Sequence, residues 1–162
     1  MNIFVLDLNP EKAAQYHCDK HVVKMVLETA QILSTVAIEK FPTARDVLYR
    51  PTHRNHPCTI WARESQENIL WLSILGLCLC KEFTYRYDKN HKSQEVIIPA
   101  SGLLLSKHAV KTFPKHNLTP FAQAMPNDYK NGDVVKAYRD YYRYEKTKLL
   151  TYTRRRKPQW LE

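Results

Sequence analysis

The sequence predicts a mainly α-helical protein that folds as one compact domain. Apolar residues recur at helical spacing through residues 19–39, and a long apolar run follows a proline helix start in residues 57–80. A chain of 162 residues has the size of one domain, and 44% hydrophobic residues are enough to build one core. We expect a single helical domain over residues 1–162, in which residues 152–162 form a basic and aromatic C-terminal tail.

The N-terminal part of the chain is predicted to be extended before it becomes helical. Residues 2–8 form a short apolar segment. Asn9 is a typical N-cap and Pro10 is favoured at the first helical position, so a short helix follows. Asp19 is predicted to act as a second cap, from which a long helix runs to about Glu39.

The long helix carries a polar stripe. At 100° per residue, one stripe holds His17, His21, Lys24, Glu28, Gln31 and Thr35. The opposite side holds Val22, Val23, Val26, Leu27, Ala30, Leu33 and Ala37. Lys24 stands four residues before Glu28, close enough to contact it, and His21 lies two turns before Glu28. The stripe is either the solvated face of an amphipathic helix or a site that presents an imidazole, an amine and a carboxylate together.

The middle of the chain is predicted to contain the most buried helix. Residues 43–57 are rich in proline and polar residues and predict a loop with polar contacts. Pro57 opens the next helix, with a restart at Ser65. Its apolar residues are Ile60, Trp61, Ile69, Leu70, Leu72, Ile74, Leu75, Leu77 and Leu79. Gly76 costs about 1 kcal/mol relative to alanine within a helix, which indicates the close approach of another helix.

The last third of the sequence is less regular. A polar break at residues 88–93 precedes a weakly patterned stretch. Residues 119–126 predict an ordered turn packed by their phenylalanine and methionine side chains. Residues 131–133, Asn-Gly-Asp, are expected to cap a final helix over residues 134–149.

Two classes of protein are not expected. The longest apolar run, Ile69 to Cys80, is interrupted by Ser73 and Gly76 and is shorter than the roughly 18 residues that span a bilayer. Charged residues follow the N-terminus too soon for a secretion signal. We expect a cytoplasmic protein with no membrane partner, whose four cysteines are reduced thiols: Cys18, Cys58, Cys78 and Cys80.

The formal net charge of +9 favours a polyanionic partner, and nucleic acid first. Much of this charge lies in residues 136–157, interleaved with tyrosines and followed by Trp160. Basic side chains bind phosphates and aromatic faces stack on exposed bases, although the tyrosines of a solvated helix would also pack on the core. The run Arg154-Arg155-Arg156-Lys157 repels itself unless an anion is near.

Metal and cofactor sites are not expected. Cys18, His21, His56 and Cys58 have the side chains of a structural zinc site, but their spacings do not match a usual zinc finger. Three glycines cannot make a glycine-rich phosphate loop, and the sequence contains neither a serine nucleophile elbow nor an HExxH helix.

Four short motifs keep their order and spacing over most of the chain. They are Asp19-Lys20-His21 with Glu28 seven residues later, Arg54-Asn55-His56-Pro57 leading into Trp61-Ala62-Arg63, Glu82 to Lys89, and Lys157-Pro158-Gln159-Trp160. Together they resemble the pyrimidine-dimer DNA glycosylases of bacteriophages, known as endonuclease V, and their bacterial relatives.

The resemblance implies a helical fold in which the N-terminus threads between helices to reach the site. It also implies that the chain's own α-amine attacks C1′ of a damaged nucleotide with the help of a glutamate. The resulting imine breaks down by β-elimination of the phosphate, as in an AP lyase. Glu28 matches the glutamate, His21 matches the helix histidine, and Met1-Asn2 match the segment that carries the amine.

The chemistry favours a terminal amine. An α-amine of ordinary pKa near 8 is about one tenth neutral at pH 7, whereas an ordinary lysine is neutral in only about four parts in ten thousand. Asn2 is not small, so we expect Met1 to be kept, and Leu27 and Gln31 stand where the phage enzymes have basic residues. Lys24 has no family counterpart, and it is either a substitute amine or the ion-pair partner of Glu28.

We expect a monomeric DNA-acting enzyme of base-excision type that binds double-stranded DNA in the cytoplasm, of the host if the chain is phage-encoded. The candidate catalytic residues are Met1, Asn2, His21, Lys24 and Glu28. The candidate nucleic-acid contacts are Arg54, His56, Arg63, Arg139, Arg143, Arg154, Arg155, Arg156 and Trp160. Two alternatives stay open: a non-catalytic nucleic-acid-binding or phage-encoded regulatory protein, and a nucleotide- or base-modifying enzyme that uses the same scaffold.

Overall fold

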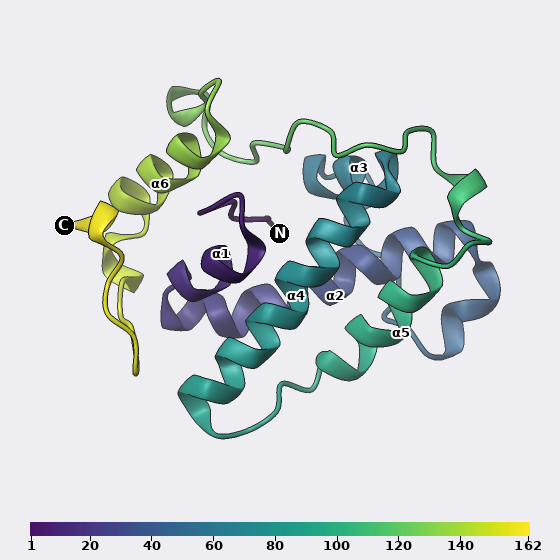
Figure 1. The fold of residues 1–162 in the computed structure, drawn as a ribbon, viewed down its shortest axis with the longest axis horizontal. Helices are drawn as coiled ribbons and strands as arrows, with labels where there is room; N and C mark the ends of the chain where they lie inside the picture. The colour runs from purple at the N-terminus through teal and green to yellow at the C-terminus, as the bar shows by residue number, and fades with distance from the viewer.

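The computed structural model describes residues 1–162 as six α-helices joined by loops and short 3-10 turns (Figure 1). The helices are α1 (Pro10–Tyr16), α2 (Asp19–Lys40), α3 (Pro57–Glu64), α4 (Gln66–Tyr87), α5 (Gln94–Leu104) and α6 (Val134–Glu145). Helices α2 and α4 pack against each other at the centre, and α1, α3 and α5 pack on this pair. Helix α6 lies on one flank beside the N-terminal segment (Figure 1). The prediction of a mainly α fold is confirmed.

Three helix starts follow the local signals in the sequence. The Asn9 side chain accepts hydrogen bonds from two backbone N–H groups in the first turn of α1, at 2.9 and 3.2 Å. Ser65 caps α4 and Asp133 caps α6 in the same way. Each cap satisfies N–H groups that a helix cannot pair internally, so the signal depends only on neighbouring residues.

The prediction that Asp19 caps the long helix is wrong. The cap position of α2 is Cys18, which makes no side-chain cap bond, and Asp19 is the first helical residue. The Asp19 carboxylate instead accepts hydrogen bonds from the guanidinium of Arg86 at 2.9 Å and from the backbone N–H and hydroxyl of Thr153. Both partners lie far along the chain from Asp19, so the neighbouring residues could not indicate these bonds.

Helix α4 is central, but one face of it and of α3 is open to solvent. Leu72 and Ile69 are fully buried, whereas Ile60, Leu70 and Ile74 are each about 40% exposed. The expectation that this is the most buried helix is wrong, because 14 of the 22 residues of α2 are buried and 12 of the 22 residues of α4. The packing partners of α4 lie on its other sides.

Gly76 lies where helices cross. A Cβ atom at this position would stand 2.7 Å from Cγ2 of Thr29 in α2 and 3.3 Å from Cδ1 of Ile97 in α5. The predicted close approach is confirmed, and it explains why this helix accepts the conformational cost of a glycine.

The weakly patterned stretch after residue 93 contains a helix that the sequence did not predict. Helix α5 includes Pro99, which costs a helix interior about 3 kcal/mol. Ile97 and Leu104 are fully buried, and burial of each contributes about 1.5–3 kcal/mol, which outweighs that cost.

The final helix is shorter than predicted. Helix α6 ends at Glu145 rather than at Leu149, and a separate 3-10 turn follows.

Residues 119–126 form no hydrogen-bonded turn and have no regular secondary structure, apart from a bend at Met125. They are ordered by packing as expected, because the Phe121 ring stacks on Trp61 at a centroid distance of 5.1 Å and meets the edge of Trp71 at 4.7 Å. This segment leads the chain across α3 to α6 (Figure 1).

By length and hydropathy, α2 meets the requirement for a membrane-spanning helix, although charged residues interrupt its apolar residues. In the fold, 78% of its most apolar window is buried inside the protein. The core helix of a soluble protein has the same composition, so α2 is only weak evidence of a membrane span.

Candidate active site

The polar stripe is divided between the protein interior and solvent. His21 and Glu28 are each 6% exposed, whereas the Lys24 side chain is 67% exposed. The part of the stripe around His21 and Glu28 is therefore not a solvated face. On the opposite side, Val23 and Leu27 are 41% and 39% exposed, which contradicts their predicted burial. The N-terminal segment covers the buried part of the stripe, because Phe4 stacks on His21 and Asn2 bonds to Glu28. Val23 and Leu27 are only partly covered.

Glu28 is held against the start of the chain. Its Oε2 accepts a hydrogen bond from the backbone N–H of Asn2 at 2.8 Å. Its Oε1 lies 3.7 Å from the α-amine of Met1 and 3.5 Å from Nζ of Lys24. A buried carboxylate therefore faces two amines, one from the chain terminus and one from its own helix.

The side chain of Asn2 anchors this terminus. Its Oδ1 accepts hydrogen bonds from the backbone N–H of Ile3 at 2.8 Å and the hydroxyl of Tyr138 at 3.0 Å. Its Nδ2 donates to the carbonyl of Ala124 at 2.9 Å. The Met1 side chain is 1% exposed. The first two residues are thus fixed by contacts to α6 and to the extended segment before it.

The two amines near Glu28 differ in their surroundings. The Lys24 side chain is 67% exposed and is the i,i+4 partner of Glu28. Since a lysine needs burial to become neutral at pH 7, its exposure favours the ion-pair interpretation. The Met1 amine is the better-placed candidate nucleophile.

His21 stands beside this pair as a neutral imidazole. Burial, followed by repulsion from His17 and nearby lysines, lowers the pKa of His21 to about 3. Its ring stacks on Phe4 at 4.6 Å, and Nδ1 lies 2.6 Å from the hydroxyl of Tyr142. His17 belongs to the end of α1 rather than to α2, and its Nδ1 meets the carbonyl of Ala13 at 2.6 Å.

These groups line a pocket of about 230 Å³. Its walls are Met1, Asn2, Phe4, His21, Lys24, Met25, Glu28, Ala124, Tyr141 and Lys146. All five candidate catalytic residues of the sequence come together here. Tyr141 and Lys146 were missed as site residues, because within the basic and aromatic stretch nothing distinguishes them from surface contacts.

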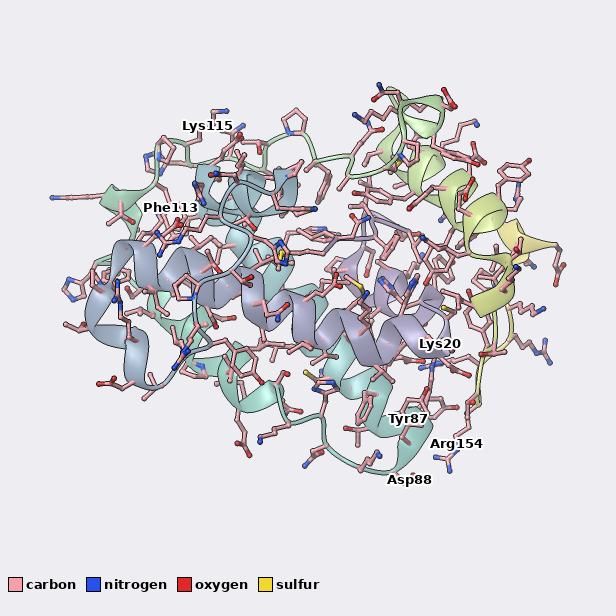
Figure 2. All side chains as sticks on the ribbon, turned by 180° about the vertical axis from the view of Figure 1, so that it is seen from behind. Lys20, Tyr87, Asp88, Phe113, Lys115 and Arg154 are labelled. Atoms are coloured by element: carbon pink, nitrogen blue, oxygen red, sulfur yellow. The ribbon has the colours of Figure 1, made fainter.

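The C-terminal tail is partly neutralised by the protein itself. Arg154 pairs with Asp88 at the end of α4, where Figure 2 shows the two side by side. Arg155 makes two hydrogen bonds of 2.9 Å to the buried carboxylate of Glu82. Asp88 and Glu82 therefore supply the anions that Arg154 and Arg155 need. Arg156 is exposed and forms no ion pair within the chain.

The other candidate nucleic-acid contacts also have internal partners. Arg139 donates to the carbonyl of Leu6 at 2.9 Å, and Arg143 donates to the carbonyl of Trp160. Arg54 and Arg63 lie 3.9 and 3.2 Å from the carboxylate of Glu39.

His56 lies near the start of the chain. It caps α3 by accepting the N–H of Cys58 at 3.2 Å. The residues that follow it contact the first two residues: the Cys58 sulfur lies 3.8 Å from Oδ1 of Asn2, and the Thr59 hydroxyl lies 3.7 Å from the Met1 sulfur. Burial, and then the charge of the terminal ammonium, lower the pKa of His56.

A second, wider hollow of about 850 Å³ lies at the tail. It is lined by Tyr16, Arg139, Arg156, Lys157, Pro158, Gln159, Trp160 and Glu162. Basic and aromatic side chains predominate there, which suits contact with phosphates and bases. Its carboxylate Glu162 and its amine Lys157 are both exposed and form no ion pair with each other, unlike Glu28 and the terminal amine, so the smaller pocket is the candidate site of chemistry.

The alternative of a zinc site has no geometric support. No three histidine, cysteine or acidic side chains lie close enough together to hold a metal ion. Cys18 lies beside Tyr142, whereas Cys58 lies beside Asn2. Burial raises the pKa of Cys58 to about 12, which disfavours the thiolate that a zinc ligand requires.

A family model described as "Pyrimidine dimer DNA glycosylase" matches residues 1–95. The match covers more than half of the chain and includes the N-terminal segment and helices α1 to α4. It therefore contains Glu28, His21 and the terminal amine, but not Tyr141, Tyr142 or Lys146. A search of curated proteins and a search of solved structures found no match.

Proposed function

The chain belongs to the pyrimidine dimer DNA glycosylase family, and we propose that it releases a damaged base from double-stranded DNA and then cuts the strand, with its own α-amine as the nucleophile. The observation that carries this mechanism is the contact between the buried carboxylate of Glu28 and the first two nitrogens of the chain, at 3.7 and 2.8 Å. Lys24 serves as a neighbouring cation that pairs with Glu28.

The proposed reaction begins at the sugar. The neutral amine forms a bond to C1′ while the glycosidic bond breaks, and the base leaves with the bonding electrons and takes up a proton. The attacking nitrogen gives one proton to Glu28, and the sugar ring opens as O4′ becomes protonated, which leaves a protonated imine. Removal of a C2′ proton then expels the 3′ phosphate by β-elimination.

Glu28 supports this reaction in two ways. Its negative charge stabilises the positive charge that develops at C1′ as the base departs. Its place beside the amine also lets it accept the proton that the attacking nitrogen loses. Because Glu28 is 6% exposed, water screens its charge less than on the surface.

The pocket also bears on the two alternatives. A purely structural polar stripe would need no opening, whereas Glu28 and His21 border a hollow of about 230 Å³. An opening beside the Glu28 and amine pair supports a site of chemistry over the non-catalytic alternative. The basic and aromatic hollow at the tail favours a polymeric nucleic acid over a single nucleotide as the substrate.

Borohydride trapping tests the imine. We expect the protein, mixed with borohydride and a duplex that carries a cyclobutane pyrimidine dimer or an abasic site, to form a covalent protein–DNA adduct. The reason is that borohydride reduces an imine to a stable amine. An undamaged duplex of the same sequence is the control and should give none. If neither damaged duplex gives an adduct, the imine mechanism fails and the non-catalytic alternative gains support.

The structure divides the tail into two kinds of basic residue, which predicts different effects on binding. We expect the double variant Arg156→Gln, Lys157→Gln to weaken DNA binding and to reduce its salt dependence by up to about two phosphate contacts, because these side chains are exposed beside the basic hollow. Arg154→Gln is the matched control and should change affinity little, since Asp88 already neutralises Arg154. Binding titrations at several salt concentrations measure both effects.

Arg155→Gln should act mainly on stability. It removes two hydrogen bonds to buried Glu82, and bonds to charged groups contribute about 1.5–3 kcal/mol. Arg86 still pairs with Glu82, which limits the loss of unfolding free energy to this order.

The binding experiment also has a contrary outcome. If Arg154→Gln weakens DNA binding as much as the double variant does, the ion pair between Arg154 and Asp88 opens in the complex and the whole basic run binds DNA.

A further inference from the structure

The hydroxyl of Tyr142 connects α6 to the candidate active site. Tyr142 is fully buried, and its oxygen lies 2.6 Å from Nδ1 of His21 in α2. The same oxygen accepts the backbone N–H of Cys18 at 3.1 Å and lies 3.5 Å from the Cys18 sulfur. Tyr142 lies outside the part of the chain that the family model matches, so this contact is not explained by that match.

The direction of the short hydrogen bond follows from the acceptors that are available. Burial raises the pKa of Tyr142 well above its usual value near 10, so the phenol keeps its single proton. That proton has two acceptors in reach, the imidazole nitrogen of His21 and the sulfur of Cys18. Sulfur is a weak acceptor and is farther away, at 3.5 against 2.6 Å. The phenol therefore donates to Nδ1 of His21.

The direction of this hydrogen bond determines whether Nε2, on the other edge of the His21 ring, carries a proton. A neutral imidazole carries one proton, so a ring that accepts at Nδ1 carries it at Nε2. Nε2 of His21 has no hydrogen-bond partner in the protein, and it is accessible rather than buried. Because His21 lines the pocket, Nε2 is the edge of the ring that reaches it. Stacking on Phe4 holds the plane of the ring.

We propose that Tyr142 is a positioning residue that holds His21 as the neutral Nε2–H tautomer, so that the pocket contains a fixed, uncharged N–H donor. The purpose of this role rests on the proposed function: Nε2–H of His21 would donate a hydrogen bond to a deoxyribose oxygen, such as O4′ as the sugar ring opens. An imidazolium in the same place would oppose the positive charge that develops at C1′. The neutral donor supports the oxygen without that repulsion.

The tautomer is measurable without any activity. In the protein labelled with ¹⁵N at histidine, the His21 signals at pH 7 should show an unprotonated Nδ1 and a protonated Nε2, with assignment by comparison to His21→Gln. In Tyr142→Phe the ring loses its Nδ1 donor, and we expect the signals to move toward a mixture of tautomers. Protonated Nδ1 in the unchanged protein would overturn the proposal even if Tyr142→Phe fails to fold.

The rate of strand cleavage supplies the second readout. Residues that orient a histidine at a metal site typically contribute about 10–100-fold, and by analogy we expect Tyr142→Phe to reduce kcat by about that factor with little change in DNA affinity. Tyr152→Phe is the matched control, because its hydroxyl donates to the carbonyl of Tyr16 instead, and it should change neither the tautomer nor the rate.

The two readouts separate this inference from the proposed function. Unchanged kcat in a folded Tyr142→Phe variant would overturn the positioning role. If the unchanged protein shows the expected tautomer but never cleaves damaged DNA, the proposed function fails while the assignment of His21 stands.

Discussion

Glu28→Gln is expected to reduce the rates of base release and strand cleavage by at least about 10³-fold, with little change in fold or DNA affinity. Glutamine keeps the volume of the side chain, and its carbonyl oxygen can still accept the N–H of Asn2. It removes the negative charge that stabilises the developing positive charge at C1′ and cannot accept the proton of the attacking amine. The loss should therefore fall on kcat. Single-turnover cleavage of a dimer-containing duplex measures it.

The matched control for this variant is Glu95→Gln, which removes the same charge from an exposed position in the first turn of α5. It should leave the cleavage rate unchanged. If Glu28 serves only as the ion-pair partner of Lys24, the outcome reverses: Glu28→Gln loses some stability and keeps any activity. Thermal unfolding of both variants distinguishes this outcome from a catalytic role.

Blocking the α-amine is expected to eliminate the borohydride-trapped adduct. Acetylation of the Met1 nitrogen, or its conversion to an amide by added upstream residues, removes the lone pair that attacks C1′. Lys24→Ala is the control, and it should retain the adduct because Lys24 is exposed and acts as a counter-ion. An adduct that disappears in Lys24→Ala but survives acetylation would identify Lys24 as the nucleophile.

The mass of the trapped peptide adds a further distinction. If Met1 is retained, the adduct is on Met1. If Met1 is removed, the nitrogen of Asn2, which lies 2.8 Å from Glu28, becomes the α-amine and carries the adduct. Either result preserves the proposed chemistry, because both nitrogens face the same carboxylate.

The sequence alone determined the features that depend on near neighbours. The caps at Asn9, Ser65 and Asp133 were predictable because a cap bonds to N–H groups two or three residues away. The alignment of His21 with Glu28 was predictable because helix geometry places residues seven apart on one face. Gly76 predicted a helix contact because few other causes explain a glycine within a helix.

The tertiary structure alone decided which side of each helix is covered. The spacing of α2 could not show that the N-terminal segment covers its polar stripe and leaves Val23 exposed, since the covering residues belong to another part of the chain. The basic run gave no sign that Asp88 and Glu82 neutralise two of its arginines. Burial and ion pairing depend on which distant segments pack together, and a local pattern of residues carries no information about that packing.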